Sequence, residues 1–140
     1  MAVRILIADD HDLVRGAVAE LLQKTDENWE IFDVADGKSA IEKAAELKPD
    51  VVILDVMMPV RDGISAGREI RSLLPTVPVV LYTSHASGTF EAEAQQAGFH
   101  AVVQKDNAAA LVTAVQSALA MRGFMSGQPT SSRNRIPPSS

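Results

Sequence analysis

The chain has no cysteine, one tryptophan and one tyrosine among its 140 residues, and aromatic residues make up only 4% of it. The absence of cysteine excludes disulfide bonds and thiolate metal sites. With so few aromatic side chains, the core must be built from Val, Ile, Leu and Ala, and the 46% hydrophobic content suffices for one such core. We therefore expect a single domain in a reducing compartment.

Positive charge and long apolar runs are also scarce. The formal net charge of −5 argues against a nucleic-acid-binding surface. No apolar stretch approaches the ~20 residues that a bilayer requires, and Met1–Arg4 leads directly into a strand-like run instead of a signal peptide. These features predict a cytoplasmic protein with no membrane segment.

Residues 123–140 are rich in Ser, Pro and Gly and show almost no apolar periodicity. Such a composition predicts a flexible tail or linker, which leaves one domain at residues 1–122. Arg133 and Arg135 are the only charged residues of this segment. Subtracting their two positive charges from −5 leaves −7 for residues 1–122, so the predicted domain is distinctly acidic.

Short apolar runs alternate with segments of helical periodicity along residues 1–122. We expect strands at 3–8, 29–35, 51–54, 77–82 and 101–104, and helices around 13–22, 40–47, 64–74, 90–97 and 111–119. Asp36-Gly37 is interpreted as a turn, and Pro49 and Pro75 end the second and third helices. Five β–α units with short connections predict an α/β fold with a parallel sheet and helices on both faces.

Polar side chains follow four of these strands at the points where the strands end. Asp9 and Asp10 follow the first strand, Asp55 the third, Thr83 the fourth and Lys105 the fifth. In an open parallel sheet the functional site lies outside the carboxyl ends of the strands. The sequence therefore predicts that carboxylates, a hydroxyl and an ammonium group meet at one edge of the sheet.

Such a cluster suits phosphoryl transfer. Neighbouring carboxylates repel one another unless a cation is present, and Mg²⁺ prefers oxygen ligands of this kind. Aspartate is also a covalent nucleophile for phosphoryl groups. Asp55 is the natural nucleophile because it lies between the acid pair and the Thr83–Lys105 pair, which would contact the phosphoryl oxygens.

Each of these residues also has a simpler interpretation. Asp9 and Asp10 could act as caps, Lys105 could be solvated and Thr83 could be an ordinary strand residue. Asp12 is expected to be a helix cap or a turn former. The joint occurrence at equivalent strand ends is what favours the functional interpretation. The histidines are expected at the surface and not among ligands: His11, His85 and His100.

Four segments resemble response-regulator receiver domains in order and spacing: ILIADDH at 5–11, VVILDVMMPVRDG at 51–63, VPVVLYTS at 77–84 and VVQKD at 102–106. The resemblance covers residues 2–122, and the DDH start and the Lys-Asp pair at 105–106 look like the NarL/LuxR-type branch. It implies a CheY-like, flavodoxin-like doubly wound sheet of order 2-1-3-4-5 with five helices. It also implies that Asp55 accepts a phosphoryl group from a sensor histidine kinase or phosphotransfer protein.

The resemblance further implies the residues that hold Mg²⁺. Asp10, Asp55 and the backbone carbonyl of Met57 would bind the ion, and Asp9 would act through a metal-bound water. Lys105 would contact the phosphoryl group together with the hydroxyl at the end of the fourth strand.

The resemblance describes a phosphorylation switch for transcriptional or other output, and not an enzyme, beyond slow Mg²⁺-dependent self-phosphorylation and autodephosphorylation. The face formed by the fourth helix, fifth strand and fifth helix is the expected surface for a homodimer or another partner. DNA would be bound only through an effector domain absent from this chain.

Some residues depart from the family pattern. Val102 stands where receivers usually carry an aromatic residue that reports phosphorylation, and Ser84 stands where Ala or Gly is common. Met57 and His85 occupy positions that tune the phosphoryl lifetime.

Three other functions share features with this sequence. A phosphorylation-independent interaction module stays open, and Val102 favours it slightly. A haloacid-dehalogenase-type phosphatase requires an acid where Met57 stands, and the acids after the first strand would repel the phosphate of a flavodoxin-like cofactor.

Overall fold

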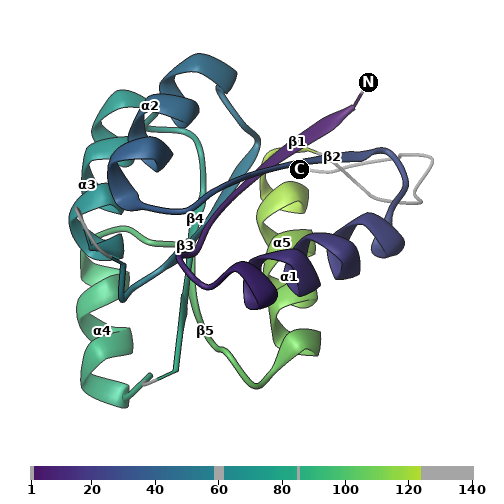
Figure 1. Ribbon diagram of the computed structural model, residues 1–140. Coiled ribbons are helices and arrows are strands. Elements are labelled where there is room, and N and C mark those ends of the chain that lie inside the picture. The colour runs from purple at the N-terminus through teal and green to yellow at the C-terminus, as the bar shows by residue number, and fades with distance from the viewer. Residues whose placement is uncertain (1, 59–61, 85, 124–140) are drawn as a thin grey trace, which may run out of the picture.

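The structure is a computed structural model that describes residues 2–58, 62–84 and 86–123. Strands and helices alternate along these residues as the sequence predicts (Figure 1). The elements are β1 Val3–Ala8, α1 Asp12–Thr25, β2 Trp29–Val34, α2 Gly37–Leu47, β3 Val51–Asp55, α3 Gly63–Leu73, β4 Val79–Thr83, α4 Gly88–Gln96, β5 Ala101–Gln104 and α5 Ala108–Met121. The predicted tail, apart from Gly123, and the predicted role of His85 lie outside the described residues.

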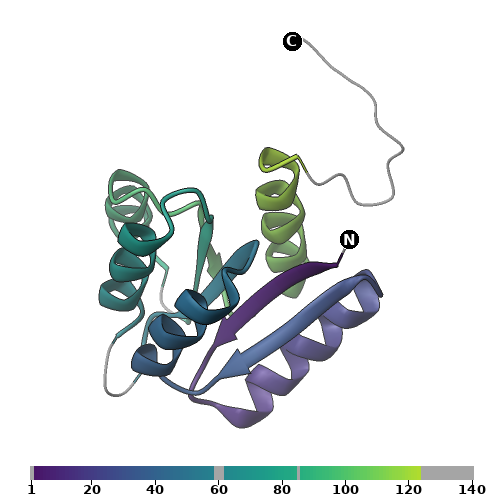
Figure 2. The ribbon, with the colours of Figure 1, turned by 90° about the horizontal axis from the view of Figure 1, so that it is seen from above.

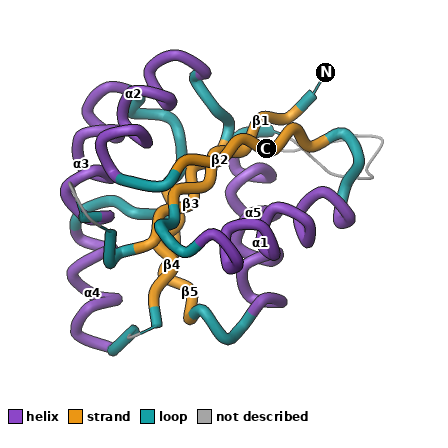
Figure 3. The backbone as a smooth tube through the Cα atoms, viewed as in Figure 1, coloured by secondary structure: helices purple, strands orange, loops and turns teal. Residues whose placement is uncertain are grey.

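The strands form one parallel sheet in the order β2-β1-β3-β4-β5, which confirms the predicted topology (Figure 3). In this register Ile5 of β1 lies between Ile31 of β2 and Val51 of β3. The chain order reverses beside β1, where β2 lies on one side and β3 on the other. The carboxyl ends of β1 and β3 therefore flank the position where open α/β sheets place their sites.

Helices cover both faces of the sheet (Figures 1 and 2). α1 and α5 lie on one face, and α2, α3 and α4 lie on the other. The core is correspondingly split in two: Ile5 and Ile7 face the α1–α5 side, whereas Leu6 and Ala8 face the α2–α4 side. This alternation follows from the two-residue period of a strand, and it makes β1 apolar on both faces.

Two local predictions need correction. α1 begins with His11 as its N-cap residue and without a side-chain cap, so the prediction that Asp12 caps the helix is wrong. Asp12 is instead the first helical residue. Asp36-Gly37 is more than a turn, because the Asp36 side chain accepts a hydrogen bond from the Ser39 N–H at 2.7 Å and caps α2.

Among the described residues, none of the helices has the length and apolarity to cross a bilayer.

Candidate functional site

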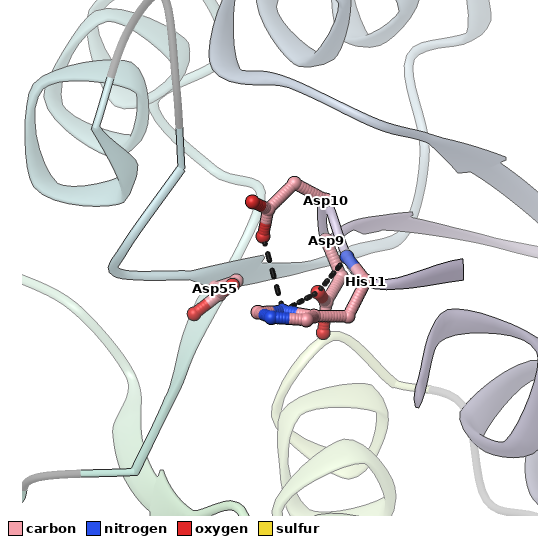
Figure 4. Close-up of side chains that lie close together, drawn as sticks. All are labelled: Asp9, Asp10, His11 and Asp55. Carbon is pink, nitrogen blue, oxygen red and sulfur yellow. Dashed lines mark hydrogen bonds and ion pairs between the residues drawn. The ribbon is translucent and has the colours of Figure 1, made fainter. Parts of the chain in front are cut away.

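The structure brings the expected acidic side chains together at the carboxyl edge of the sheet. Asp9 directly follows β1, and Asp55 is the last residue of β3. Figure 4 shows their side chains beside those of Asp10 and His11. Asp9 and Asp55 are only 1% and 2% exposed, an unusual degree of burial for carboxylates. Two charges buried this deeply require compensation.

Lys105 supplies that compensation from the end of β5. Its Nζ lies 3.1 Å from Asp55 Oδ2 and 3.2 Å from Asp9 Oδ2. Neither oxygen accepts a well-directed hydrogen bond from the described chain, so the ion pair with the ammonium group is their main interaction. The Lys105 side chain is itself 14% exposed. One cation therefore lies between two buried anions.

The electrostatic balance shifts the pKa values of the pair. Burial raises the pKa of Asp55, and the nearby Asp9 adds to the increase, while Lys105 and the Met57 N–H oppose it. For Lys105, burial acts to lower the pKa, but the attraction of Asp55 and Asp9 outweighs burial and the pKa is raised. The ammonium form is thus favoured, whereas ionised Asp55 remains costly to bury.

Backbone contacts orient the two carboxylates. Asp55 Oδ1 accepts a hydrogen bond from the Met57 N–H at 3.2 Å, and Asp9 Oδ1 accepts one from the His11 N–H at 2.8 Å. In each case Oδ2 faces Lys105. Gly63 allows the loop after β3 to return closely, because a Cβ at this position would overlap the Asp55 carbonyl oxygen.

Thr83 ends β4 beside this cluster and is 3% exposed. The Lys105 N–H donates a hydrogen bond to the Thr83 carbonyl oxygen at 2.9 Å. The Tyr82 hydroxyl donates one to the Lys105 carbonyl oxygen, also at 2.9 Å. The backbone of Lys105 is therefore anchored to β4 on both sides of its Cα atom.

His11 contributes to the cluster in a way that the sequence did not predict. Its side chain is 66% exposed, as expected of a surface residue, yet its Nδ1 lies 3.2 Å from Asp10 Oδ1 and 3.5 Å from Asp9 Oδ1. The adjacency of His11 to the two acids was visible in the sequence. Only the fold shows that the ring turns back toward them (Figure 4).

Arg15 is a second contributor to the site that the sequence does not predict. Its guanidinium group donates to the Asp9 carbonyl oxygen at 2.7 Å, to Asp33 Oδ2 at 2.9 Å and to Asp12 Oδ1 at 2.8 Å. The contacts tie the loop after β1 to the end of β2. The i,i+3 spacing from Asp12 could have suggested one of these contacts, but the others depend on the fold.

The donor set fits a small divalent cation. One ligand atom from each of Asp9, Asp10, His11 and Asp55 lies within 4.8 Å of the others. Carboxylate oxygens are the hard ligands that Mg²⁺ prefers, and the partly exposed Asp10 leaves one side open to water. Met57 follows closely after Asp55, and its side chain is 70% exposed, so the side chain does not fill the site.

Comparison with known proteins identifies the family. The sequence model of the response regulator receiver domain matches residues 5–116, most of the chain. The chain belongs to the response-regulator receiver domain family. It is therefore a receiver domain of the kind found in two-component response regulators, for which accepting a phosphoryl group is the standard function.

Individual relatives agree with this assignment. The transcriptional regulatory protein LnrK of Bacillus subtilis is 39% identical over 107 residues, which cover 76% of this chain and 49% of LnrK. The chain thus spans about half the length of this relative.

Solved structures resemble this chain over nearly the whole fold. A LuxR-family response regulator from Aurantimonas gives a TM-score of 0.80 at 28% identity, covering 99% of this chain and 92% of that one. The chemotaxis protein CheY4 of Vibrio cholerae gives 0.77 at 29% identity, covering 85% and 100%.

Proposed function

We propose that Asp55 is the residue of this receiver that accepts the phosphoryl group, from a sensor histidine kinase or a phosphotransfer protein. The observation that carries the proposal is the position of the Asp55 carboxylate. It is buried at the sheet edge, 3.1 Å from Lys105 and beside two further acids. A carboxylate that lies beside an ammonium group and beside an acidic cluster able to hold a divalent cation is suited to receive an anionic group.

The transfer step assigns a part to each side chain. An Asp55 carboxylate oxygen forms a bond to phosphorus while the bond from phosphorus to the donor histidine nitrogen breaks, and the electron pair leaves on that nitrogen. The Lys105 ammonium would neutralise charge on the phosphoryl oxygens, and the Thr83 hydroxyl would donate a hydrogen bond to one of them. Because burial raises the pKa of Asp55, Lys105 also helps to keep the nucleophile ionised.

We assign the Mg²⁺ site to Asp10, Asp55 and the Met57 carbonyl, with Asp9 acting through a water molecule. Bound there, Mg²⁺ would supply positive charge to the phosphoryl oxygens. Arg15 fixes the carbonyl of Asp9, and His11 contacts the side chain of Asp10. Both contacts hold the loop that presents the acids.

Output would pass through the face formed by α4, β5 and α5, to a homodimer contact or another partner. This face contains a cavity of about 420 Å³ between α4 and β5, lined in part by Gln95, Phe99 and Val102. The small Val102 side chain, in place of an aromatic one, lies against the cavity. Any DNA binding would belong to an effector domain outside this chain, and the expected setting is cytoplasmic.

The test is the intact mass of the protein after incubation with acetyl phosphate and Mg²⁺. We expect a gain of one phosphoryl group, which disappears when Mg²⁺ is removed and in Asp55→Asn. Asp10→Asn should raise the Mg²⁺ concentration needed for half-maximal phosphorylation without changing the modified residue. A folded wild-type protein that binds Mg²⁺ but gains no mass would contradict the proposal and support the phosphorylation-independent interaction module.

A further inference from the structure

A glutamine at the end of β5 holds the backbone that follows Thr83. Gln104 Nε2 donates a hydrogen bond to the Ser84 carbonyl oxygen at 2.6 Å. Its Oε1 accepts one from the Ala86 N–H at 3.1 Å. The side-chain amide thus uses its donor and its acceptor on the same segment of chain. Gln104 thereby fixes Ser84 and Ala86 to the edge of the sheet.

Gln104 also lies between the proposed site and α4. It pairs with Thr83 in the β4–β5 ladder and directly precedes Lys105. Ala86, which donates a hydrogen bond to Gln104, directly precedes Ser87, the N-cap residue of α4. A movement of Ser84 or Ala86 relative to β5 would therefore reach the site and α4 together, and it would have to break these hydrogen bonds.

The neighbouring side chains of β5 cannot make this contact. Val103 packs in the core cluster that includes α5, while Val102 packs against the opposite cluster. Because side chains alternate along a strand, Gln104 shares the face of Val102. Val102 has no polar side-chain atom with which to bind the backbone of Ser84 or Ala86. The amide of Gln104 has both a donor and an acceptor.

We propose that Gln104 is a positioning residue that holds Thr83, Ser84 and Ala86 in their resting place and opposes their movement toward a phosphoryl group on Asp55. The inference rests on the proposed function. An aspartyl phosphate adds negative charge and strong acceptor oxygens beside β4, which attract the Thr83 hydroxyl. Gln104 stabilises the arrangement without the phosphoryl group, so it lowers the population of the arrangement that binds one.

The experiment compares the full chain with Gln104→Met, which keeps the side-chain length but removes both hydrogen bonds. The probe is beryllium fluoride, a phosphoryl mimic that binds carboxylates, titrated at saturating Mg²⁺. Gln104→Met should bind it about fivefold more tightly, the factor for one net hydrogen bond. Gln96→Met, at the exposed end of α4, is the matched control and should bind it like the wild type.

Two further readouts separate positioning from general damage. The Mg²⁺ dissociation constant, measured by NMR titration, should be the same in all three proteins. Hydrogen exchange of the Ala86 amide should be faster in Gln104→Met than in wild type, since the variant removes its acceptor. The side chain of Gln104→Asn is one methylene shorter, so this variant should match Gln104→Met in its Mg²⁺ dissociation constant and in its Ala86 exchange rate.

If Gln104→Met binds beryllium fluoride no more tightly than the wild type, or if its Ala86 exchange rate is unchanged, this inference is overturned while the proposed function stands. If the Mg²⁺ dissociation constant of Gln104→Met changes by the same factor as its beryllium fluoride affinity, the inference is also overturned, because the whole site would then be distorted. If the wild type and Asp55→Asn fail alike to bind the probe, the proposed function fails and this inference fails with it.

Discussion

Removing the cation between the two buried carboxylates should destabilise the protein in a pH-dependent way. The change is Lys105→Met, which keeps the length of the side chain. Loss of one partner of a buried ion pair costs about 3–5 kcal/mol, and the partial exposure of Lys105 and the ability of Asp55 to take up a proton place this case near the lower end. We therefore expect a loss of about 3 kcal/mol in the free energy of unfolding at pH 7.5.

The pH dependence follows from the pKa of Asp55. This pKa is raised in the folded state, so the protonated carboxyl favours folding at low pH and that contribution is lost as pH rises through the folded pKa. Lys105→Met removes an opposing charge and raises the pKa further. The loss of stability should thus be largest at pH 7.5 and smaller at pH 5. Adding Asp55→Asn should recover about 1–2 kcal/mol at pH 7.5, because one uncompensated charge is removed.

Urea unfolding followed by Trp29 fluorescence measures these differences. Trp29 is the only tryptophan, and it is 2% exposed at the start of β2. Lys24→Met is the control, since Lys24 is 75% exposed and 4.0 Å from its partner, and it should change stability by less than about 0.5 kcal/mol. If Lys105→Met costs no more than the control, or the same at both pH values, the account of the ion pair is wrong.

Four other substitutions test separate parts of the account. Gly67→Ala should lower the free energy of unfolding in urea by about 1–3 kcal/mol, because the new Cβ would lie 2.5 Å from Cε1 of Phe99. Gly16→Ala should raise it by about 0.5–1 kcal/mol, because Gly16 lies in an exposed turn of α1 and its new Cβ would meet no atom within 4 Å. Arg15→Met should weaken Mg²⁺ binding in an NMR titration as well as stability; an unchanged Mg²⁺ affinity would show that the clamp on Asp9 does not position the acids. Asp10→Asn should weaken Mg²⁺ binding by about tenfold or more while leaving the Asp55–Lys105 pair intact, and equal affinity would remove Asp10 from the ligand set.

Periodicity and strand boundaries predicted most of the fold. The apolar runs located the strands because β1 and β3 are covered on both faces, and the coincidence of polar strand ends located the edge where Asp9, Asp55 and Lys105 meet. The strand order came from the family resemblance and not from periodicity. The predicted fourth strand begins at Val77, two residues before β4 does, because an apolar run does not show which of its residues join the ladder.

The remaining contacts depend on tertiary structure. Arg15 reaches Asp33, 18 residues away, only because α1 packs beside the end of β2. Gln104 acquires its partners from the loop after the neighbouring strand, 18 and 20 residues earlier. A polar side chain at a strand end has many potential partners in sequence. Its actual partners are set by sheet register and by the path of the next loop.

The central claim is that Asp55 carries the phosphoryl group, and the most direct test locates the modified residue. The protein is phosphorylated with acetyl phosphate and Mg²⁺ and treated with borohydride, which reduces an aspartyl phosphate to homoserine, before peptide mass mapping. We predict homoserine at position 55 and at no other aspartate, with none formed when Mg²⁺ is withheld. Modification of Asp9 or Asp10 with position 55 unchanged would contradict the account.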